Sequence, residues 1–290
     1  DNGGANAGHT VHVGTTKIAL HQLGSGILHD NCTIILGKDM VLHPEDLVSE
    51  IQQVKKAKQN FNPKQLLIDE MAVLSLDTHR AFETALKIHN GSGKGSTGRG
   101  ISPAYADIVY RHPLRMRDFK KRNWKALFEQ HYELYEKLCY GFGKKLHSFE
   151  VTRVSGSLIT VGKKIDFIQR LEKARKTLLP LITDVHELLE KNWNSTTPMV
   201  FEKAQALGID KRWGVYPDIT ASNCAPDGIY SSTEGIVDPD LIEIKTAVIK
   251  STYTSSVGSR ILPTMMEKEL AHKIREDAHE YGSTTGRPRD

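Results

Sequence analysis

Short β-branched runs separated by glycines alternate with helix-like segments in the first part of the chain. Three runs have the composition of strands that end in turns: Thr10–Val13, Lys17–Leu20 and Thr33–Leu36. Pro44 then opens a segment with acidic residues in its first turn and lysines in its last, as in a helix. The stretch KQLLIDE predicts another strand, and Asp77 can cap a helix that ends near Ile88. This order of elements favours an α/β fold.

The rest of the chain extends this pattern. Apolar residues recur at helical spacing from Arg117 to about Leu146, and again from Ile165 to Lys191. A strand is predicted from Met199, and LIEIKTAVIKSTYT predicts another. We therefore expect one α/β domain over residues 1–290, with a mixed, largely parallel central sheet, flanking helices and a helical excursion in the middle. The abrupt ends at Asp1 and Asp290 lead us to expect a segment of a longer polypeptide.

Composition excludes several classes of protein. The 290 residues are 39% hydrophobic and 26% charged, which is typical of a folded domain that stays in water. A net charge of +4 is too small to indicate nucleic-acid binding. The three cysteines, Cys32, Cys139 and Cys224, have neither zinc-site nor disulfide-framework spacing. With no membrane-length apolar run and no signal-like start, we predict a cytoplasmic protein without nucleic-acid or membrane partners.

Four polar stretches could carry chemistry. HNGSGKGSTGRG, residues 89–100, can cradle a phosphate on its backbone N–H groups with help from Lys94 and Arg99, or it can be a solvated loop. It fits neither a P-loop nor a specific dinucleotide motif. NGGANAGHT places His9 where it can bind phosphate or donate a proton, or simply form a turn. The tail YGSTTGRPR can hold an anion or be a basic tail.

The fourth stretch, FEKAQALGIDKRWGVYPDITASN, follows the predicted strand at Met199. Its polar residues Gln205, Asp210 and Thr220 would leave the carboxyl end of that strand, where ligands bind in α/β sheets. A loop anchored by Trp213 and Tyr216 is the alternative.

The four stretches, together with YTSSVGSRILPT, form an ordered set that resembles the adenylosuccinate synthetase family. The family forms are NAGHT, GTTGRGIGPAY, FEGAQG with GTYP and VTSSN, TRVGAGPFPTE and TTGRRRR, and the likeness runs from Asn2 to Arg289. The resemblance implies a ligase of purine and AMP biosynthesis that condenses IMP with L-aspartate, using GTP and Mg²⁺. In that scheme the purine 6-oxygen attacks the γ-phosphate, and the aspartate amine then displaces this phosphate.

The resemblance also implies roles for individual residues. His9 would contact the transferred phosphoryl group, Gln205 would stabilise charge on the 6-oxygen, and the Gly8 carbonyl would bind Mg²⁺. Arg111 would reach the nucleotide of a second subunit in a homodimer. The remaining substrate contacts would come from a larger set: Asn6, Thr97 and Thr220 on the IMP phosphate, Val257 and Arg287 on the ribose, Thr284, Thr285 and Arg287 on aspartate, and Arg289 near the nucleotide phosphates.

Some positions depart from the family pattern. Lys203 and Ala206 replace two glycines beside Gln205, Ser102 and Ser256 replace a glycine and an arginine, and Ser259–Leu262 replaces AGPF. The family's GDEGKGK stretch would precede Asp1, and its guanine-reading part would follow Asp290. Two alternatives therefore stay open: a related ligase for a GMP-type nucleotide, and a non-catalytic module that binds nucleotide or takes part in assembly.

Overall fold

The computed structural model describes residues 1–14, 16–58, 60–90, 96–249, 253, 255, 264–281 and 288–289. Its parallel strands form two three-stranded sheets. One has the order β1 (Gly3–Gly4), β5 (Met40–Leu42), β7 (Val73–Leu74), and the other has the order β10 (Ile182–Thr183), β6 (Leu66–Asp69), β4 (Ile34–Leu36). The mixed α/β class with largely parallel strands is confirmed, with the parallel strands in two sheets instead of one.

Two antiparallel hairpins complete the strand content of the described residues. β2 (His9–Val13) pairs with β3 (Thr16–Leu20), and β8 (Glu150–Thr152) pairs with β9 (Leu158–Thr160). β1 approaches β5 so closely that a Cβ on Gly4 would lie 1.9 Å from the Val41 carbonyl oxygen. Only glycine fits there, and this fixes the backbone that leads into the NAGHT motif.

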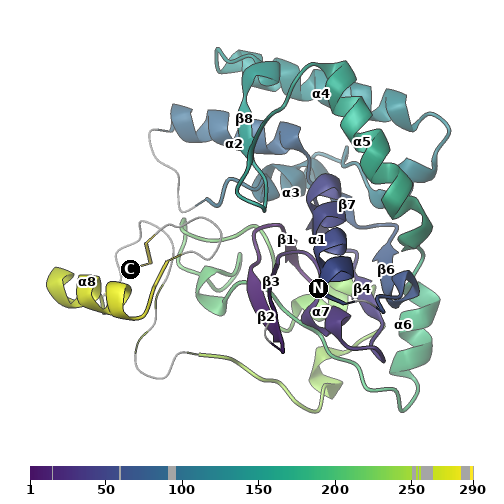
Figure 1. Ribbon diagram of the computed structural model, residues 1–290, viewed down its shortest axis with the longest axis vertical. Coiled ribbons are helices and arrows are strands. Elements are labelled where there is room, and N and C mark those ends of the chain that lie inside the picture. The colour runs from purple at the N-terminus through teal and green to yellow at the C-terminus, as the bar shows by residue number, and fades with distance from the viewer. Residues whose placement is uncertain are drawn as a thin grey trace.

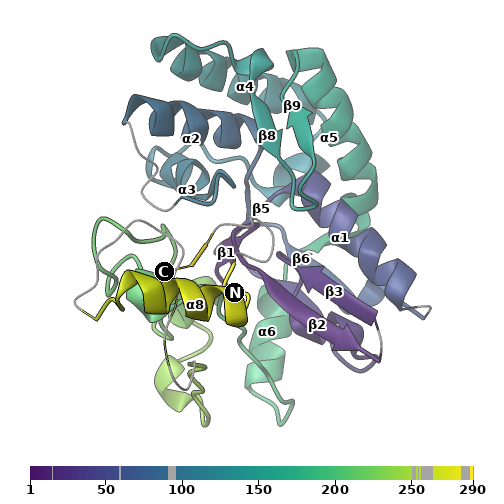
Figure 2. The ribbon, with the colours of Figure 1, turned by 60° about the vertical axis from the view of Figure 1, so that its left-hand side comes forward.

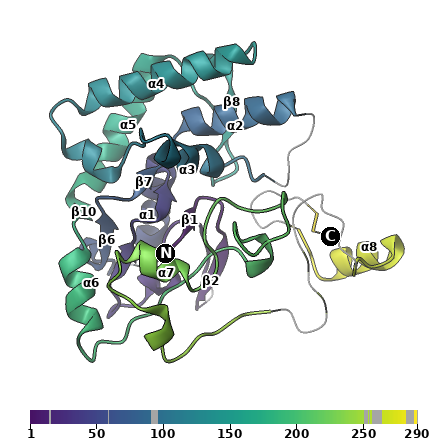
Figure 3. The same cartoon turned by 180° about the vertical axis from the view of Figure 1, so that it is seen from behind.

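Helices cover the strands and build one end of the molecule. The helices of the described residues are α1 (Pro44–Ala57), α2 (Asp77–His89), α3 (Ile101–Val109), α4 (Trp124–Gly141), α5 (Lys164–Leu178), α6 (His186–Trp193), α7 (Gly228–Ser232) and α8 (Lys268–Asp277). Figures 1 and 2 show α2, α4 and α5 together at one end and the β2–β3 hairpin at the other, with α1 between them. α1 packs on α5, and α2 packs on α3 and α4. Figure 3 shows α8 at the side, near the C-terminus.

The helical predictions hold with shorter bounds. The region from Arg117 begins with a 3-10 turn (Met116–Lys120), and α4 starts only at Trp124. The second region divides into α5 and α6 because Pro180 lies between them and cannot continue a helix. Asp77 is the first residue of α2 and not its cap. Its carboxylate instead forms buried ion pairs with arginines.

Two predicted strands are wrong. The segment that begins at Met199 has no strand, and Val200 is exposed. In the second prediction, residues 242–249 form no strand either, and Ile244, Val248 and Ile249 all lie on the surface, while residues 250–252 and 254 lie outside those described. β-branched composition makes a strand only where a neighbouring backbone can pair with it, and neither segment has such a ladder partner in the described chain. No helix among the described residues has the length and apolarity needed to span a bilayer.

Candidate functional site

The glycine turn at the N-terminus lies directly beneath Gln205. A Cβ on Gly3 would lie 2.8 Å from Gln205 Oε1 and 3.0 Å from Asn6 Oδ1, so both side chains cover this turn. The Gly4 N–H donates to Asn6 Oδ1 at 2.9 Å, which leaves the Asn6 amide hydrogens as donors. Two of the predicted site residues, Asn6 and Gln205, are therefore brought together from opposite parts of the chain.

Neighbouring side chains fix the orientation of the Gln205 amide. Asn2 Nδ2 and Ser222 Oγ both donate to Gln205 Oε1, each at 3.2 Å. The Gln205 Nε2 atom therefore points the other way, and it is buried without a hydrogen-bond partner among the described residues. Gln205 also has a φ of 65°, in the left-handed region that a non-glycine residue rarely adopts. An unpaired buried donor on a strained backbone is a feature of functional sites.

His9 begins β2, and its ring is held at one nitrogen. His9 Nε2 lies 2.8 Å from the Leu23 carbonyl oxygen, which can only accept, so Nε2 carries the proton. Nδ1 is the second nitrogen, 3.8 Å from Glu202 Oε1. Glu202 also accepts from the backbone N–H and the hydroxyl of Ser25. The ring is thus oriented, with Nδ1 beside an acidic group, which suits a histidine that gains positive charge.

The contacts around Gly8 do not form a complete magnesium site. The Gly8 carbonyl offers one oxygen ligand, and this residue is exposed. Protein-bound Mg²⁺ is usually held by one or two carboxylates together with substrate phosphates. Glu202, whose carboxylate lies beside the His9 ring, already accepts a hydrogen bond from the Ser25 N–H. The described residues therefore do not by themselves fit a resident Mg²⁺ ion.

The predicted phosphate loop is described from Ser96 onward, and Glu83 of α2 holds this part. Glu83 accepts from Ser96 Oγ at 2.5 Å and from the Gly100 N–H at 2.7 Å. A Cβ on Gly100 would lie 2.8 Å from His79 Cβ, so the loop packs directly on α2 and needs glycine where α3 begins. Thr97 lies between these anchors and is half-buried. Gly91, Ser92, Gly93, Lys94 and Gly95 lie outside the described residues.

Arg99 does not add its charge to the loop surface as expected. The side chain is buried, and its Nη1 donates to the Thr152 carbonyl of β8 at 2.7 Å. Ser75 Oγ donates to the Arg99 carbonyl at 3.0 Å. Arg99 therefore ties the loop to β8, because its guanidinium donates to the Thr152 carbonyl.

Asp210 organises the loop that follows Gln205. Its carboxylate accepts from four backbone N–H groups on both sides of the loop, those of Arg212, Trp213, Cys224 and Ala225. Thr220 is tied to the same loop by its N–H, which donates to the Ile209 carbonyl at 2.7 Å. The alternative anchors, Trp213 and Tyr216, are both largely exposed. The loop is thus fixed by a buried carboxylate and not by aromatic packing.

The other predicted site residues are not joined to this cluster by described contacts. Arg111 is exposed just after α3, with a φ of 66°. Arg289 is held near the C-terminus, where its N–H donates to the Glu280 carbonyl and its guanidinium lies 3.5 Å from the Glu280 carboxylate. The predicted ribose and aspartate contacts Val257, Thr284, Thr285 and Arg287 lie outside the described residues, as does Ser256.

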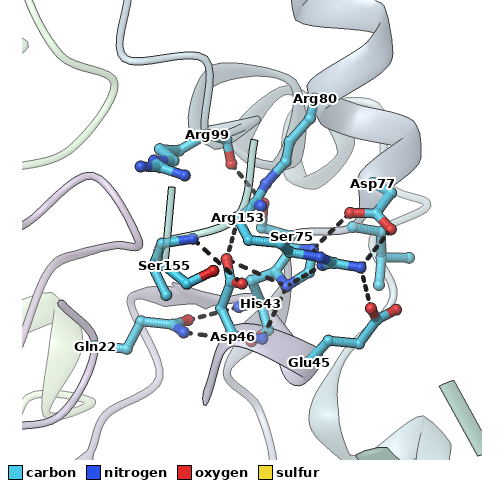
Figure 4. A network of polar contacts seen from close by, with 12 residues as sticks. Gln22, His43, Glu45, Asp46, Ser75, Asp77, Arg80, Arg99, Arg153 and Ser155 are labelled. Carbon is cyan, nitrogen blue, oxygen red and sulfur yellow. Dashed lines mark hydrogen bonds and ion pairs between the residues drawn. The ribbon is translucent and has the colours of Figure 1, made fainter. Parts of the chain in front are cut away.

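A buried ion network joins the start of α1 to α2 and to Arg153, which follows β8 (Figure 4). At its centre, His43 Nε2 lies 3.1 Å from Asp77 Oδ1, and burial lowers the pKa of His43 to about 4. Arg153 bridges Asp77 and Glu45, and burial raises the pKa of Glu45 to about 7. Arg80 is fully buried and donates to Asp46 Oδ2 at 2.5 Å.

The network touches both parts of the candidate site. At one end, the His43 N–H donates to Gln22 Oε1 at 2.6 Å, in the turn next to Leu23. At the other, Arg80 Nη1 donates to the same Thr152 carbonyl that binds Arg99. No local pattern in the sequence predicts this arrangement, because His43 precedes α1, Arg153 follows β8, and their partners come from α1 and α2.

A second buried cluster, His79, Asp107 and His131, has ligand atoms within 4.8 Å of one another. Its hydrogen bonds argue against a metal ion. His79 Nδ1 accepts from the Leu76 N–H at 2.8 Å, so Nε2 carries the proton and donates to Asp107 Oδ2 at 3.0 Å. Tyr135 donates to the other Asp107 oxygen, and burial lowers the pKa of His131. The cluster is a satisfied polar network that ties α2, α3 and α4 together.

Comparisons with known proteins show the family of this chain. The sequence profile of the adenylosuccinate synthetase family matches residues 1–290, the whole chain. The chain belongs to the adenylosuccinate synthetase family. An adenylosuccinate synthetase of Bordetella pertussis is 35% identical over 289 residues, which are 99% of this chain and 62% of that relative. One from Neisseria meningitidis serogroup A is 34% identical over 294 residues, 99% of this chain and 63% of its own. The chain thus spans less than two thirds of these curated relatives.

Solved structures support the family at the level of fold. The fully ligated adenylosuccinate synthetase of Plasmodium falciparum matches with a TM-score of 0.84 and 28% identity, over 99% of this chain and 63% of that one. A cyanophage S-2L succinoaminodeoxyadenylate synthetase, bound to dGMP and dATP, matches with a TM-score of 0.58 and 18% identity, over 98% of this chain and 67% of that one. The cyanophage match shows a shared fold only.

Two departures from the adenylosuccinate synthetase pattern leave Gln205 undisturbed. Lys203 turns away from Gln205, and its Nζ lies 2.9 Å from Asp1 Oδ2. Ser102 is exposed in the first turn of α3. Neither side chain makes a described contact with the Gln205 amide.

Proposed function

We propose that this protein is a ligase that condenses IMP with L-aspartate to form adenylosuccinate, with GTP as phosphoryl donor and Mg²⁺ as the accompanying ion. It would act in purine nucleotide biosynthesis, in the cytoplasm, as a homodimer. Residues 1–290 would form a single α/β domain of this enzyme. Family membership and the arrangement around Gln205 support this proposal.

The observation that carries the proposal is the oriented, unpaired Gln205 amide. In the first step, the purine 6-oxygen attacks the γ-phosphate of GTP, the bond to the β-phosphate oxygen breaks, and GDP leaves. Gln205 Nε2 would donate to the 6-oxygen, where negative charge develops as the proton of the purine ring passes to the aspartate that the family carries in its GDEGKGK stretch. Asn2 and Ser222 already hold Oε1, so the orientation of the amide is set and Nε2 is left to donate.

Other residues would bind and orient. His9 would donate to the transferred phosphoryl group through Nδ1 once this second ring nitrogen also carries a proton, while Nε2–H stays on the Leu23 carbonyl. Asn6, Thr97 and Thr220 would hold the IMP 5′-phosphate, and Asn6 has its amide hydrogens turned outward by the Gly4 contact. In the second step, the aspartate amine attacks carbon 6 and inorganic phosphate leaves. Thr284, Thr285 and Arg287 would hold aspartate, with Val257 and Arg287 on the ribose and Arg289 near the nucleotide phosphates.

Full-length protein tests the proposal through formation of adenylosuccinate and GDP. We expect Gln205→Ala to lower kcat about 10²- to 10³-fold, the usual effect of removing one such donor. Gln53→Glu, on the exposed side of α1, is the matched control and should leave the rate unchanged. Parallel assays with GMP in place of IMP test the related ligase. Nucleotide binding without any product would contradict the ligase proposal and favour a binding module.

A further inference from the structure

Glu50 of α1 binds a turn of the backbone with a single carboxylate. Its Oε2 atom accepts from three consecutive N–H groups, those of His21, Gln22 and Leu23, at 3.1, 3.0 and 3.2 Å. The side chain is completely buried. Burial raises its pKa to about 7, and these hydrogen bonds oppose that shift. Burying a carboxylate costs free energy unless hydrogen bonds compensate for the lost water. Here the compensating bonds are those to the backbone of the turn, and they hold it in place.

The same turn contacts both His9 and the residues that precede it. The Leu23 carbonyl accepts from His9 Nε2 at 2.8 Å and so determines which ring nitrogen carries the proton. His21 Nδ1 lies 2.6 Å from the Ala7 carbonyl oxygen, next to Gly8. The Gln22 side chain adds two contacts with the backbone of His43, at the start of α1. The turn is thus clamped to α1 on one side and faces His9 on the other.

We propose that Glu50 is a positioning residue for the phosphoryl-transfer step: by fixing residues 21–23, it keeps the His9 Nε2–H on the Leu23 carbonyl, so that Nδ1 is the nitrogen that takes up a second proton and then donates to the transferring group. Glu50 itself touches no reacting atom in this proposal. The inference rests on the proposed function for its kinetic consequence, but the state of the His9 ring can be measured without catalysis.

Gln65 provides a matched control. Its Nε2 donates to three backbone carbonyls, those of His29, Asp30 and Cys32, in a different turn. Gln65→Leu therefore removes a comparable buried clamp that makes no contact with His9. Glu50→Leu leaves three N–H groups without their acceptor, whereas Glu50→Gln keeps an oxygen acceptor in the same place and removes the charge.

The first measurement is ¹⁵N NMR of histidine-labelled full-length protein, with the His9 signals assigned from their loss in His9→Asn. We expect the Nε2–H form in the wild type, in Gln65→Leu and in Glu50→Gln, and loss of that preference in Glu50→Leu. If Glu50→Leu does not fold, Glu50→Asp replaces it, because the shorter side chain cannot reach all three N–H groups. An unchanged His9 ring in the folded variant would overturn the proposal, whether or not the protein is a ligase.

The second measurement is a double-mutant cycle on kcat. We expect Glu50→Leu to lower kcat about 10- to 100-fold, the scale of a misplaced catalytic group, with the KM for IMP little changed. In a His9→Asn background, Glu50→Leu should add almost nothing, because both changes remove the same contribution. Glu50→Gln should restore most of the rate, and Gln65→Leu should lower thermal stability only. If the two substitutions lower kcat by independent factors that multiply in the double variant, Glu50 does not act through His9 and the proposal is wrong. A wild-type protein without ligase activity would refute the proposed function instead.

Discussion

Gly3 and Gln205 are so close that the glycine has no room for a side chain: a Cβ on Gly3 would lie 2.8 Å from Gln205 Oε1 and 3.1 Å from Nε2. We expect Gly3→Ala to displace the amide and lower kcat. Its φ of 68° adds a backbone cost of about 1–2 kcal/mol. Gly143→Ala separates the two effects, because Gly143 has a φ of 69° and no atom near its Cβ position. Equal kcat values for the two variants would contradict the role of Gln205.

Glu83 gives a test of the phosphate loop. We expect Glu83→Ala to release Ser96 and the Gly100 N–H and to raise the KM for IMP about 10-fold, because two hydrogen bonds to a charged group are lost. Steady-state kinetics with IMP as the varied substrate give the value. Glu136→Ala, an exposed change on α4, should leave KM as it is. A normal KM for IMP in folded Glu83→Ala would show that this loop does not take part in IMP binding.

The sequence predicted well where local chemistry decides the structure. Pro44, the acids after it and the lysines at its end predicted α1, and the β2–β3 hairpin followed from its β-branched runs. The NAGHT turn and Gln205 were found by motif, and the structure brings Asn6 and Gln205 together over Gly3. Their roles in catalysis remain predictions.

The failures have a common physical cause, which is partners distant in sequence. After Met199 the chain does run beside the N-terminus, but Ala204 pairs through both its N–H and its carbonyl with the Asn2 side chain. A side-chain amide thus replaces the backbone ladder, and no strand forms. Glu50 and Glu83 look like ordinary helix residues in the sequence, because the N–H groups they bind lie in other segments.

The His43 network predicts a specific pH dependence of stability. The pKa of His43 is about 4 in the folded protein and 6.5 as a free side chain, so the folded state resists protonation. His43 therefore contributes stability above pH 6.5 that is lost as pH falls towards 4. Glu45 and Glu50 have the opposite effect on stability. Burial raises both pKa values to about 7, so the stability that these two residues contribute to the fold is lost as pH rises through 7.

The contribution of His43 is isolated by comparing the wild type with His43→Gln. We expect the free energy of unfolding of the wild type, relative to that of His43→Gln, to fall by about 3 kcal/mol between pH 7 and pH 4. A difference of this size between the folded and free pKa values of His43 corresponds to that free energy. Urea titrations at several pH values give the measurement. His12→Gln, an exposed change in β2, should show no such trend. A constant difference between wild type and His43→Gln would mean that the imidazole titrates alike in both states.

Arg111 tests the proposed homodimer. It is exposed after α3, and its φ of 66° turns the chain sharply away from that helix. If Arg111 completes the partner's site, Arg111→Leu and His9→Asn dimers should each be nearly inactive. Their equimolar mixture should regain about a quarter of the wild-type sites, because half of the dimers are hybrids with one intact site each. No recovery after demonstrated subunit exchange would rule out a shared site.

His9 is where a catalytic role and a packing role predict different results. His9→Asn keeps a small polar amide in the turn but is too short to reach the Leu23 carbonyl, so we expect only a small loss of stability. It removes the imidazole nitrogen beside Glu202 and the positive charge that a protonated ring can offer. We therefore expect kcat to fall about 10²-fold or more while the KM for IMP changes little.

A packing role predicts the reverse pattern for the same variant. If the ring only closes the turn, His9→Asn should lower the free energy of unfolding by about 1 kcal/mol, the usual scale of a partly exposed substitution, and kcat should stay normal. Melting temperature, kcat and KM measured on one preparation separate the two. Because the ring is already fixed at Nε2 by Leu23, a normal kcat would show that Nδ1 has no partner in the reaction, and the catalytic role of His9 would be wrong.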